Sequence, residues 1–360
     1  MHRLFLATFL LLGVALAMPA QAQINDPSDV ESLDDLGRAL QFVGNEYADR
    51  YVQPVTDAFG SGINAGLFRD ADTGAGLIPK LDIYIGTYVS GALMANSQRY
   101  FDGSEIPDDQ FKLPDGTDVV LSVEGQNLPS AFGERDSPLL EEARLELRTT
   151  DGTIIDLAPN NPEEEAVRVP AGLVDTPIAP LVMPQIGIGT IFGTSVQARF
   201  LPETRLQEYG TIGMFGIGVT HSLSQYIPMF PIDLAVQGMY NSLTLSDRGA
   251  ITQSAEGVSD VLDASGWAVN LQASRGIPVL PITFYGGLQY EQFEVDYSYL
   301  FDPTLGSGTL DPVEITLSQS ASNQIRGVAG LSLTLAIIRL NVDYAISNND
   351  AITAGIGLQL

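Results

Sequence analysis

The sequence predicts an all-β fold: an antiparallel transmembrane β-barrel of about 12 strands (range 10–14), with an N-terminal amphipathic helix as plug or lid. Three observations predict it. Ten segments alternate apolar and polar residues along most of the chain. No apolar run beyond the N-terminal one approaches the roughly 18 residues of a membrane-spanning helix. The connections between these segments also sort by length onto two sides, which favours a barrel over a sandwich.

The N-terminus has the composition of a secretory signal peptide. His2 and Arg3 precede an apolar run over 4–17, and the small-residue tripeptide at 20–22 resembles a cleavage site. We therefore expect residues 1–22 to be removed and the mature chain to be exported from the cytoplasm. A retained helical anchor is the alternative.

Charge and cysteine content exclude several classes of protein. The chain carries a net charge of −27, and removal of the signal peptide, which contains one arginine and no acid, makes it −28. Such a charge repels the phosphates of nucleic acids, so no nucleic-acid partner is expected. The chain has no cysteine. It can therefore form neither a disulfide nor a thiolate metal site.

Residues 23–78 are expected to form a helix and a lead-in to the barrel. From 26 to 51 the apolar residues recur at helical spacing. Pro27 and Ser28 mark a start, and Pro54 follows the expected end. An amphipathic helix needs an apolar surface to pack against. The helix either packs on the core of a soluble domain or serves as the plug or lid of a barrel.

Residues 79–360 are assigned to the barrel. Within them the polar-apolar alternation of period two predicts strands at 81–93, 184–191, 194–201, 210–220, 231–245, 264–275, 281–299, 312–336, 338–346 and 351–360.

The stretch 94–182 interrupts this rhythm. It holds 18 acidic and six basic residues, and the turn signals at 114–116 and 150–152 lie between short strand-like runs. It is either one long, acidic extracellular insertion or the source of one or two further hairpins. Adding one hairpin to the ten segments gives the expected 12 strands.

The connections sort onto two sides if the first strand runs outward. The long ones are 94–183, 202–209, 246–263, 300–312 and 347–350, and the tight turns are 191–194, 275–281 and 336–338. Outer-membrane barrels place short turns in the periplasm and long loops outside. The stretch 221–230 is the exception, because it falls among the short turns.

The last residues, "AITAGIGLQL", resemble the signal that the barrel-assembly machinery reads at the end of outer-membrane barrels. Thr353, Gly355, Leu358 and Leu360 match its pattern, although the family norm is a terminal Phe or Trp. The resemblance implies the cell outer membrane as location, with the assembly machinery and outer-membrane lipid as partners.

Three further stretches resemble known families. The segment 51–71, "YVQPVTDAFGSGINAGLFRDA", is similar to the lead-in of the long-chain fatty-acid outer-membrane transporters, in which an N-terminal plug precedes the barrel. The sequences at 184–202 and 216–228 resemble an uncharacterised group of outer-membrane barrels. The first resemblance implies passage of hydrophobic solutes and a small hydrophobic ligand, but no ligand residue aligns.

Catalysis and metal binding have little support. His221 is the only histidine beyond the signal peptide, and an extended strand turns the neighbouring Ser222 to the opposite face, so no enzyme activity is expected. Asp70 and Asp72 resemble a fragment of a calcium loop. A solvated turn is the simpler interpretation, and we expect neither a metal nor a cofactor.

The inward-facing positions predict a polar lumen lining. This lining would be an ion-pair network or, alternatively, a permeation path or ligand site. The function expected is passage of small or hydrophobic solutes across the outer membrane. A non-transporting structural or adhesive surface barrel and a secreted all-β domain are the alternatives. The lining candidates are Asp82, Gln197, Arg199, Asp233, Gln237, Asn241, Asn270, Gln272, Arg339, Asn341 and Asp343.

Overall fold

The computed structural model describes residues 28–71, 82–112, 118–135, 144–149, 152–156, 171–172, 175–189, 193–206, 210–227, 229–246, 262–301, 304–305, 308–309 and 313–359. The chain divides into two compact units. The barrel unit contains Thr56–Met94, Ile178–Pro303 and Asp311–Leu360, and the second unit contains Met1–Val55, Ala95–Pro177 and Thr304–Leu310.

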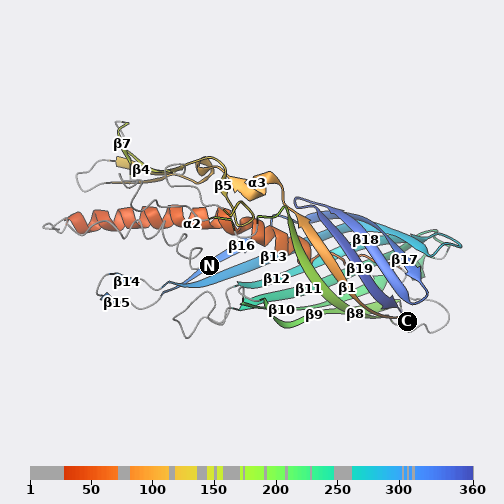
Figure 1. Cartoon of the computed structure of the whole chain (residues 1–360). Helices are drawn as coiled ribbons and strands as arrows, with labels where there is room; N and C mark the ends of the chain where they lie inside the picture. Colours follow the sequence, from red (N-terminus) through yellow and green to blue (C-terminus); the bar gives the residue numbers. More distant parts are fainter. Residues whose placement is uncertain are drawn as a thin grey trace. The chain divides into compact units, whose positions relative to one another are not determined.

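The barrel unit is an antiparallel sheet closed on itself (Figure 1). Each strand pairs with its neighbours in the barrel, and the first strand pairs with the last, which completes the cylinder. The strands are β1 (Asp82–Leu93), β8 (Ile178–Gly189), β9 (Thr194–Leu206), β10 (Gly210–Ser222), β11 (Asp233–Ser246), β12 (Leu262–Gly276), β13 (Ile282–Phe301), β16 (Val313–Ser320), β17 (Ile325–Leu335), β18 (Ile338–Ile346) and β19 (Ala351–Gln359).

Strands β16 and β17 occupy one position in the barrel wall. Both pair with β13, β16 along 294–301 and β17 along 282–290. The residues between them, 321–324, form a bulge, and the backbone bonds from Glu291 N to Gln324 O and from Ala321 N to Phe293 O keep this bulge attached to β13. In the part of the chain that the structure describes, the barrel therefore has ten strand positions.

The predicted barrel is confirmed, and its ten predicted segments coincide with the ten strand positions. The strand number lies within the range 10–14, but the preferred value of 12 is too high. The expected extra hairpin in 94–182 forms outside the barrel sheet. Its strands are too short to cross a bilayer, since β7, for example, has 3 residues where roughly 9–11 are needed.

The second unit contains a four-stranded sheet in the order β3-β4-β6-β7 and a pair β2–β5. Hairpins β3–β4 and β6–β7 lie around the two predicted turn signals. Tyr47 packs edge-on against Phe101, with ring centroids 5.2 Å apart. The elements are α3 (Asn96–Arg99), β2 (Tyr100–Phe101), η1 (Gly103–Glu105), β3 (Asp109–Lys112), β4 (Asp118–Glu124), β5 (Leu128–Pro129), β6 (Arg144–Thr149), β7 (Ile154–Asp156), β14 (Thr304–Leu305) and β15 (Gly308–Thr309).

Helix α2 (Ser28–Ile63) is longer than expected. The predicted end before Pro54 is wrong, because the helix continues through this proline for more than two turns. The boundary between the two units falls within α2, between Val55 and Thr56. Among the described helices, none is long and apolar enough to cross a membrane.

The two ends of the barrel differ in their connections. The turn end carries the connections at 190–193, 223–232, 277–281 and 336–337, of which 223–232 contains the short helix η2 (Ser224–Tyr226). The loop end carries the connections at 94–177, 207–209, 247–261, 302–312 and 347–350. Strand β1 begins at the turn end, where β19 finishes.

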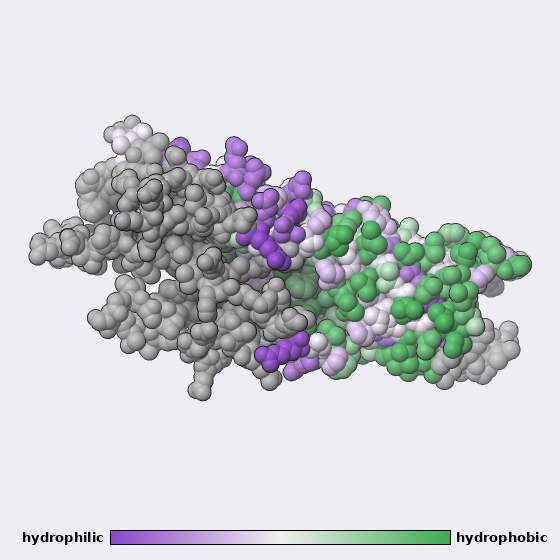
Figure 2. Space-filling view, in the orientation of Figure 1, coloured by the Kyte–Doolittle hydropathy of each residue, from purple (hydrophilic) through white to green (hydrophobic). Residues whose placement is uncertain are grey.

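Buried and exposed residues alternate along the strands. In β18 the even positions are exposed and apolar, while Arg339, Asn341 and Asp343 are buried. Hydrophobic residues gather over the barrel on the face seen in Figure 2. The barrel is therefore apolar outside and largely polar inside, the reverse of a soluble domain.

Candidate functional site

The interior of the barrel contains a part of its own chain. Residues 56–71, the end of α2 and the coil after it, are almost all buried, and we call them the lumen segment. Their hydrogen-bond partners lie on β9, β11, β12, β13, β16, β17 and β18. A segment with partners on strands around the whole wall lies inside the barrel.

The lumen segment runs from the loop end to the turn end. Thr56 bonds to Tyr297 (2.8 Å), on the loop-end half of β13, and to Gln319 (2.6 Å), on β16, which is the loop-end part of its position in the wall. At the other end, Asp70 accepts a bond of 2.9 Å from Ser274, near the turn end of β12. Arg339, at the turn end of β18, donates to the Arg69 carbonyl.

Arg199 binds the middle of the segment. Its guanidinium is fully buried and donates to the carbonyls of Ile63 at 2.6 Å and Ala65 at 2.7 Å. Its Nε donates to Gln185 Oε1 at 3.0 Å. Ile63 is the last residue of α2, and Ala65 lies just beyond it. Carbonyls at the end of a helix lack partners within the helix, and Arg199 satisfies these two.

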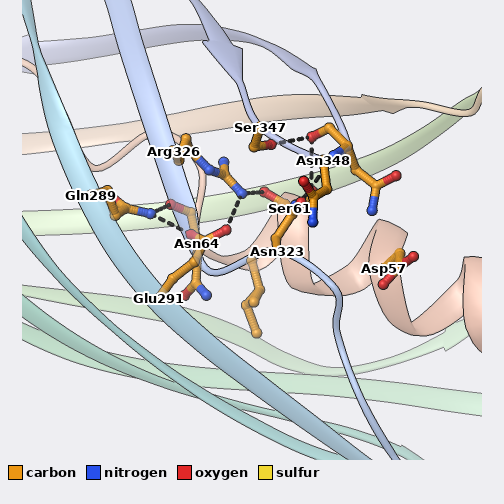
Figure 3. A network of polar contacts seen from close by, with 12 residues as sticks. Asp57, Ser61, Asn64, Gln289, Glu291, Asn323, Arg326, Ser347 and Asn348 are labelled. Atoms are coloured by element: carbon orange, nitrogen blue, oxygen red, sulfur yellow. Dashed lines mark hydrogen bonds and ion pairs between the residues drawn. The ribbon is translucent and has the colours of Figure 1, made fainter.

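A buried ion pair lies beside this point. Arg326 and Glu291 are 2.8 Å apart, and each side chain is 1% exposed. Figure 3 shows that Arg326 also reaches Ser61, whose carbonyl accepts a bond of 3.0 Å. Gln289 joins the carboxylate of Glu291 to the carbonyl of Asn64. A pair buried this far is costly to desolvate, and removing one partner leaves an uncompensated charge.

Three further contacts attach the segment to the loop end. Asp57 accepts a bond of 2.8 Å from the backbone N–H of Ser322. The Ser61 hydroxyl donates to the carbonyl of Asn349 at 3.1 Å and accepts from the amide of Asn323. Both Ser322 and Asn323 belong to the bulge between β16 and β17, so the bulge supplies a backbone N–H that a regular strand would use in its ladder and a side-chain amide.

Two glycines allow the helix to fit inside the wall. A Cβ on Gly60 would lie 2.8 Å from the Cβ of Ala321, and one on Gly62 would lie 3.2 Å from Leu181. The loop-end part of the interior is apolar here: Ile63 packs in a cluster with Leu181, Met183, Ile212, Met214, Leu243, Leu262, Phe293 and Val295.

The predicted lining residues are placed as follows. Asp233 is half-buried, and the side chain of Asp82 lies outside the described residues. Amide side chains bond to one another along the inner wall, as in Asn270 to Gln237 (2.8 Å). The buried members are Gln197, Arg199, Gln237, Asn241, Asn270, Gln272, Arg339, Asn341 and Asp343.

Four further residues of this network, all buried, were not among the residues predicted to line the lumen: Gln185, Gln289, Glu291 and Arg326. A signal was present, because Gln289 and Glu291 alternate with apolar or aromatic residues in a predicted strand. The pairing of Glu291 with Arg326 depends on the register between β13 and β17, which the sequence does not reveal.

The other candidates lie apart from the network. His221 is at the turn end, where its Nδ1 is 2.8 Å from Thr194 Oγ1 and its Nε2 is 3.0 Å from Tyr226 Oη. Asp72 lies outside the described residues. Within the described ranges, no group of three or more His, Asp or Glu side chains is placed to hold a metal ion.

The end of the chain follows the same inside-outside pattern. Thr353 is fully buried, Gly355 lies beneath the Tyr88 ring, and Leu358 faces outward. Leu360 lies outside the described residues.

These features define an antiparallel β-barrel with an apolar exterior and a lumen that contains part of its own chain. The chain belongs to the family described as a family of unknown function (DUF6588), whose model matches residues 1–360. A search among curated proteins found no match.

Solved structures similar to this chain include three bacterial barrels. Ail of Yersinia pestis is 10% identical, with 79% of this chain and 100% of that chain covered and a TM-score of 0.23. The translocator domain of NalP from Neisseria meningitidis is 10% identical (93% and 99% covered, TM-score 0.25). The transport unit of AIDA-I from Escherichia coli is 8% identical (86% and 97%, 0.28). Likenesses at these scores say nothing about activity.

Proposed function

We propose that the protein is an outer-membrane β-barrel that is sealed by its lumen segment and that anchors the acidic insertion after β1 at the membrane surface. The observation that carries the proposal is the set of buried contacts from Arg199, Arg326 and Arg339 to the lumen segment. A barrel held closed from inside in this way suits an anchor better than a permanently open pore.

The exterior supports a membrane location. The outward residues of β18, from Ile338 to Ile346, are exposed and apolar or aromatic over all 9 residues of the strand. This length matches the roughly 9–11 residues of a strand that crosses a bilayer. Water-exposed apolar surface of this extent would be a liability in a soluble protein. Closed barrels with short turns on one side and long loops on the other are typical of outer membranes.

Passage of small or hydrophobic solutes is the second candidate. The apolar cluster around Ile63, Leu181 and Met183 at the loop end favours it, because an apolar solute could enter there if the lumen segment moved. In this case the lumen segment would be a gate, and transport would require its displacement.

Conductance in planar bilayers tests the seal. We expect the full chain to show no steady conductance, and R199A/R326A to show openings, because both changes remove donors that hold the segment. Arg205→Ala is the matched control, since Arg205 lies on the same strand as Arg199 but is exposed. Steady conductance of the unaltered chain would contradict the sealed barrel.

A cross-link separates anchor from gate. Asn64 on the segment and Asn241 on β11 are joined by a hydrogen bond of 3.1 Å. In a chain without cysteine, N64C/N241C can be linked by a disulfide or a short bifunctional reagent. If the barrel is only an anchor, no apolar dye is taken up, whether or not the two cysteines are linked. Dye uptake that is lost on linking and restored on release would establish the gate instead.

A further inference from the structure

One set of wall side chains binds the main chain of the lumen segment, beside the contacts made to its side chains. The buried arginines donate to backbone carbonyls: Arg199 to those of Ile63 and Ala65, Arg326 to that of Ser61 and Arg339 to that of Arg69. Gln289 does the same at Asn64. Carbonyls are present in every polypeptide, so these contacts select a peptide chain as such and not one side-chain pattern.

The direction of the segment has a consequence for topology. Thr56 lies at the loop end and Asp70 at the turn end, where β1 starts. Whatever position the residues before Thr56 adopt, they are attached to the lumen segment at the loop end.

We propose that the lumen of this barrel is a binding site for polypeptide, and that the chain uses it to place its own N-terminal part on the outer side of the membrane. The inference rests on the proposed function, since the turn end must face the periplasm for the loop end to face outward. In the described part of the chain, ten strand positions bring the end of β19 back to the turn end, where β1 begins. The crossing through the lumen therefore leaves the mature N-terminal part and the end of β19 on opposite sides of the membrane.

Cysteine labelling in Gram-negative cells that produce the full chain tests this arrangement. The natural chain has no cysteine, so each introduced thiol is the only one in this protein. Ser32→Cys probes the N-terminal part. Asn348→Cys, on the exposed connection between β18 and β19, marks the loop end, and Val279→Cys, fully exposed between β12 and β13, marks the turn end. The probe is a membrane-impermeant maleimide, applied before and after the outer membrane is permeabilised.

The inference predicts that S32C and N348C react in intact cells and that V279C reacts only after permeabilisation. If N348C reacts in intact cells but S32C needs permeabilisation, the threaded N-terminus is wrong and the proposed function still stands. If V279C reacts in intact cells and N348C does not, the orientation is reversed and both fail. If all three positions react only after permeabilisation, none of them lies outside the cell, and this result contradicts the outer-membrane barrel itself.

A protease provides a second readout that does not depend on the exposure of one side chain. A cleavage site inserted between Asp26 and Pro27 should be cut by protease added to intact cells. The same site inserted into the turn at 277–281 should be cut only after permeabilisation. Protection of the N-terminal site in intact cells, with cutting after permeabilisation, would overturn the inference.

Discussion

Individual glycines determine how the first and last strands meet. Tyr88 on β1 lies directly opposite Gly355 on β19, and its ring occupies the space where a Cβ of Gly355 would lie, 2.6 Å from Cε1. The ring of Tyr84 covers Gly357 in the same way, at 2.5 Å. Large aromatic rings that fold over glycines on a neighbouring strand fill the interior and shield the exposed backbone.

This packing predicts the effect of a single methyl group. Gly355→Ala should lower the free energy of unfolding by about 1–3 kcal/mol, because the fully buried Tyr88 ring has little room to move. Gly238→Ala on β11 is the control: its methyl would meet no atom within 4 Å. We expect it to be neutral or to gain roughly 0.5–1 kcal/mol. Urea unfolding in detergent micelles measures both, and equal effects would contradict the packing argument.

At this scale the sequence predicts the face of each side chain but not its partner. The period of two was enough to mark Arg199 and Arg339 as inward residues. That both would bind carbonyls of residues 63–69 depends on a contact across more than a hundred positions, which no local pattern encodes. Gly355 was expected only as part of an assembly signal, and its packing against Tyr88 gives it a second role.

Among the neighbouring strands of the described barrel wall, β8 and β9 have the shortest ladder. The ladder at this junction covers Gln185–Gly189 and Ser195–Arg199, whereas β1 pairs with β8 as far as Ile178 and β10 pairs with β9 as far as Leu206. Pro180 and Pro202 lie on the loop-end halves of β8 and β9, and Pro184 lies at the centre of β8, next to the first paired residue, Gln185. The three prolines fall on positions of one parity, and a proline supplies no N–H to a ladder.

Hydrogen exchange should therefore be fastest at this junction. We expect amides in 179–183 and 200–206 that face the junction to exchange roughly ten-fold or more faster than those between β11 and β12, which pair along their whole length. Pro202→Thr should slow exchange at neighbouring amides by restoring a donor. Exchange as slow as in β11, or no change in the variant, would show that the two strands are tightly joined despite the short ladder.

Strand prediction succeeded because a strand in a barrel wall repeats one strong alternation over many residues. The helix was harder. Pro54, Gly60 and Gly62 all predict an end to α2, yet the helix continues to Ile63 because its last turns lie inside the wall. Tertiary contacts such as Asp57 with Ser322 stabilise turns that intrinsic propensity disfavours. The same glycines that weaken the helix make it narrow enough for the lumen.

For the whole molecule, the position of the bilayer follows from the apolar exterior. The outward residues of β18 begin at Ile338, directly after the turn at 336–337. In the proposed outer-membrane location, the hydrocarbon layer therefore starts close to the turn end. The neighbouring turns agree with this position, since Met229 and Val279 at their tips are fully exposed and apolar.

An arginine placed at two depths tests this position. Val342→Arg, in the middle of β18, should cost about 2–4 kcal/mol of folding free energy in lipid vesicles, and Ile338→Arg at the turn end about 0–1 kcal/mol. The difference arises because a side chain near the interface can reach water. Urea titration of folding into vesicles measures both values. Equal costs at the two positions would contradict the proposed membrane boundary.

The pairing of β1 with β19 also sets an order of events in time. The wall is complete only when the last strand of the chain meets the first, and by then residues 56–71 must already lie within the curling sheet, since their contacts fill the space that closure encloses. The segment is thus synthesised before every strand of the barrel, and the later strands assemble around it. In a chain that lacked the segment, we expect closure of the barrel itself to fail. This defect would precede any leakage of solutes through the lumen.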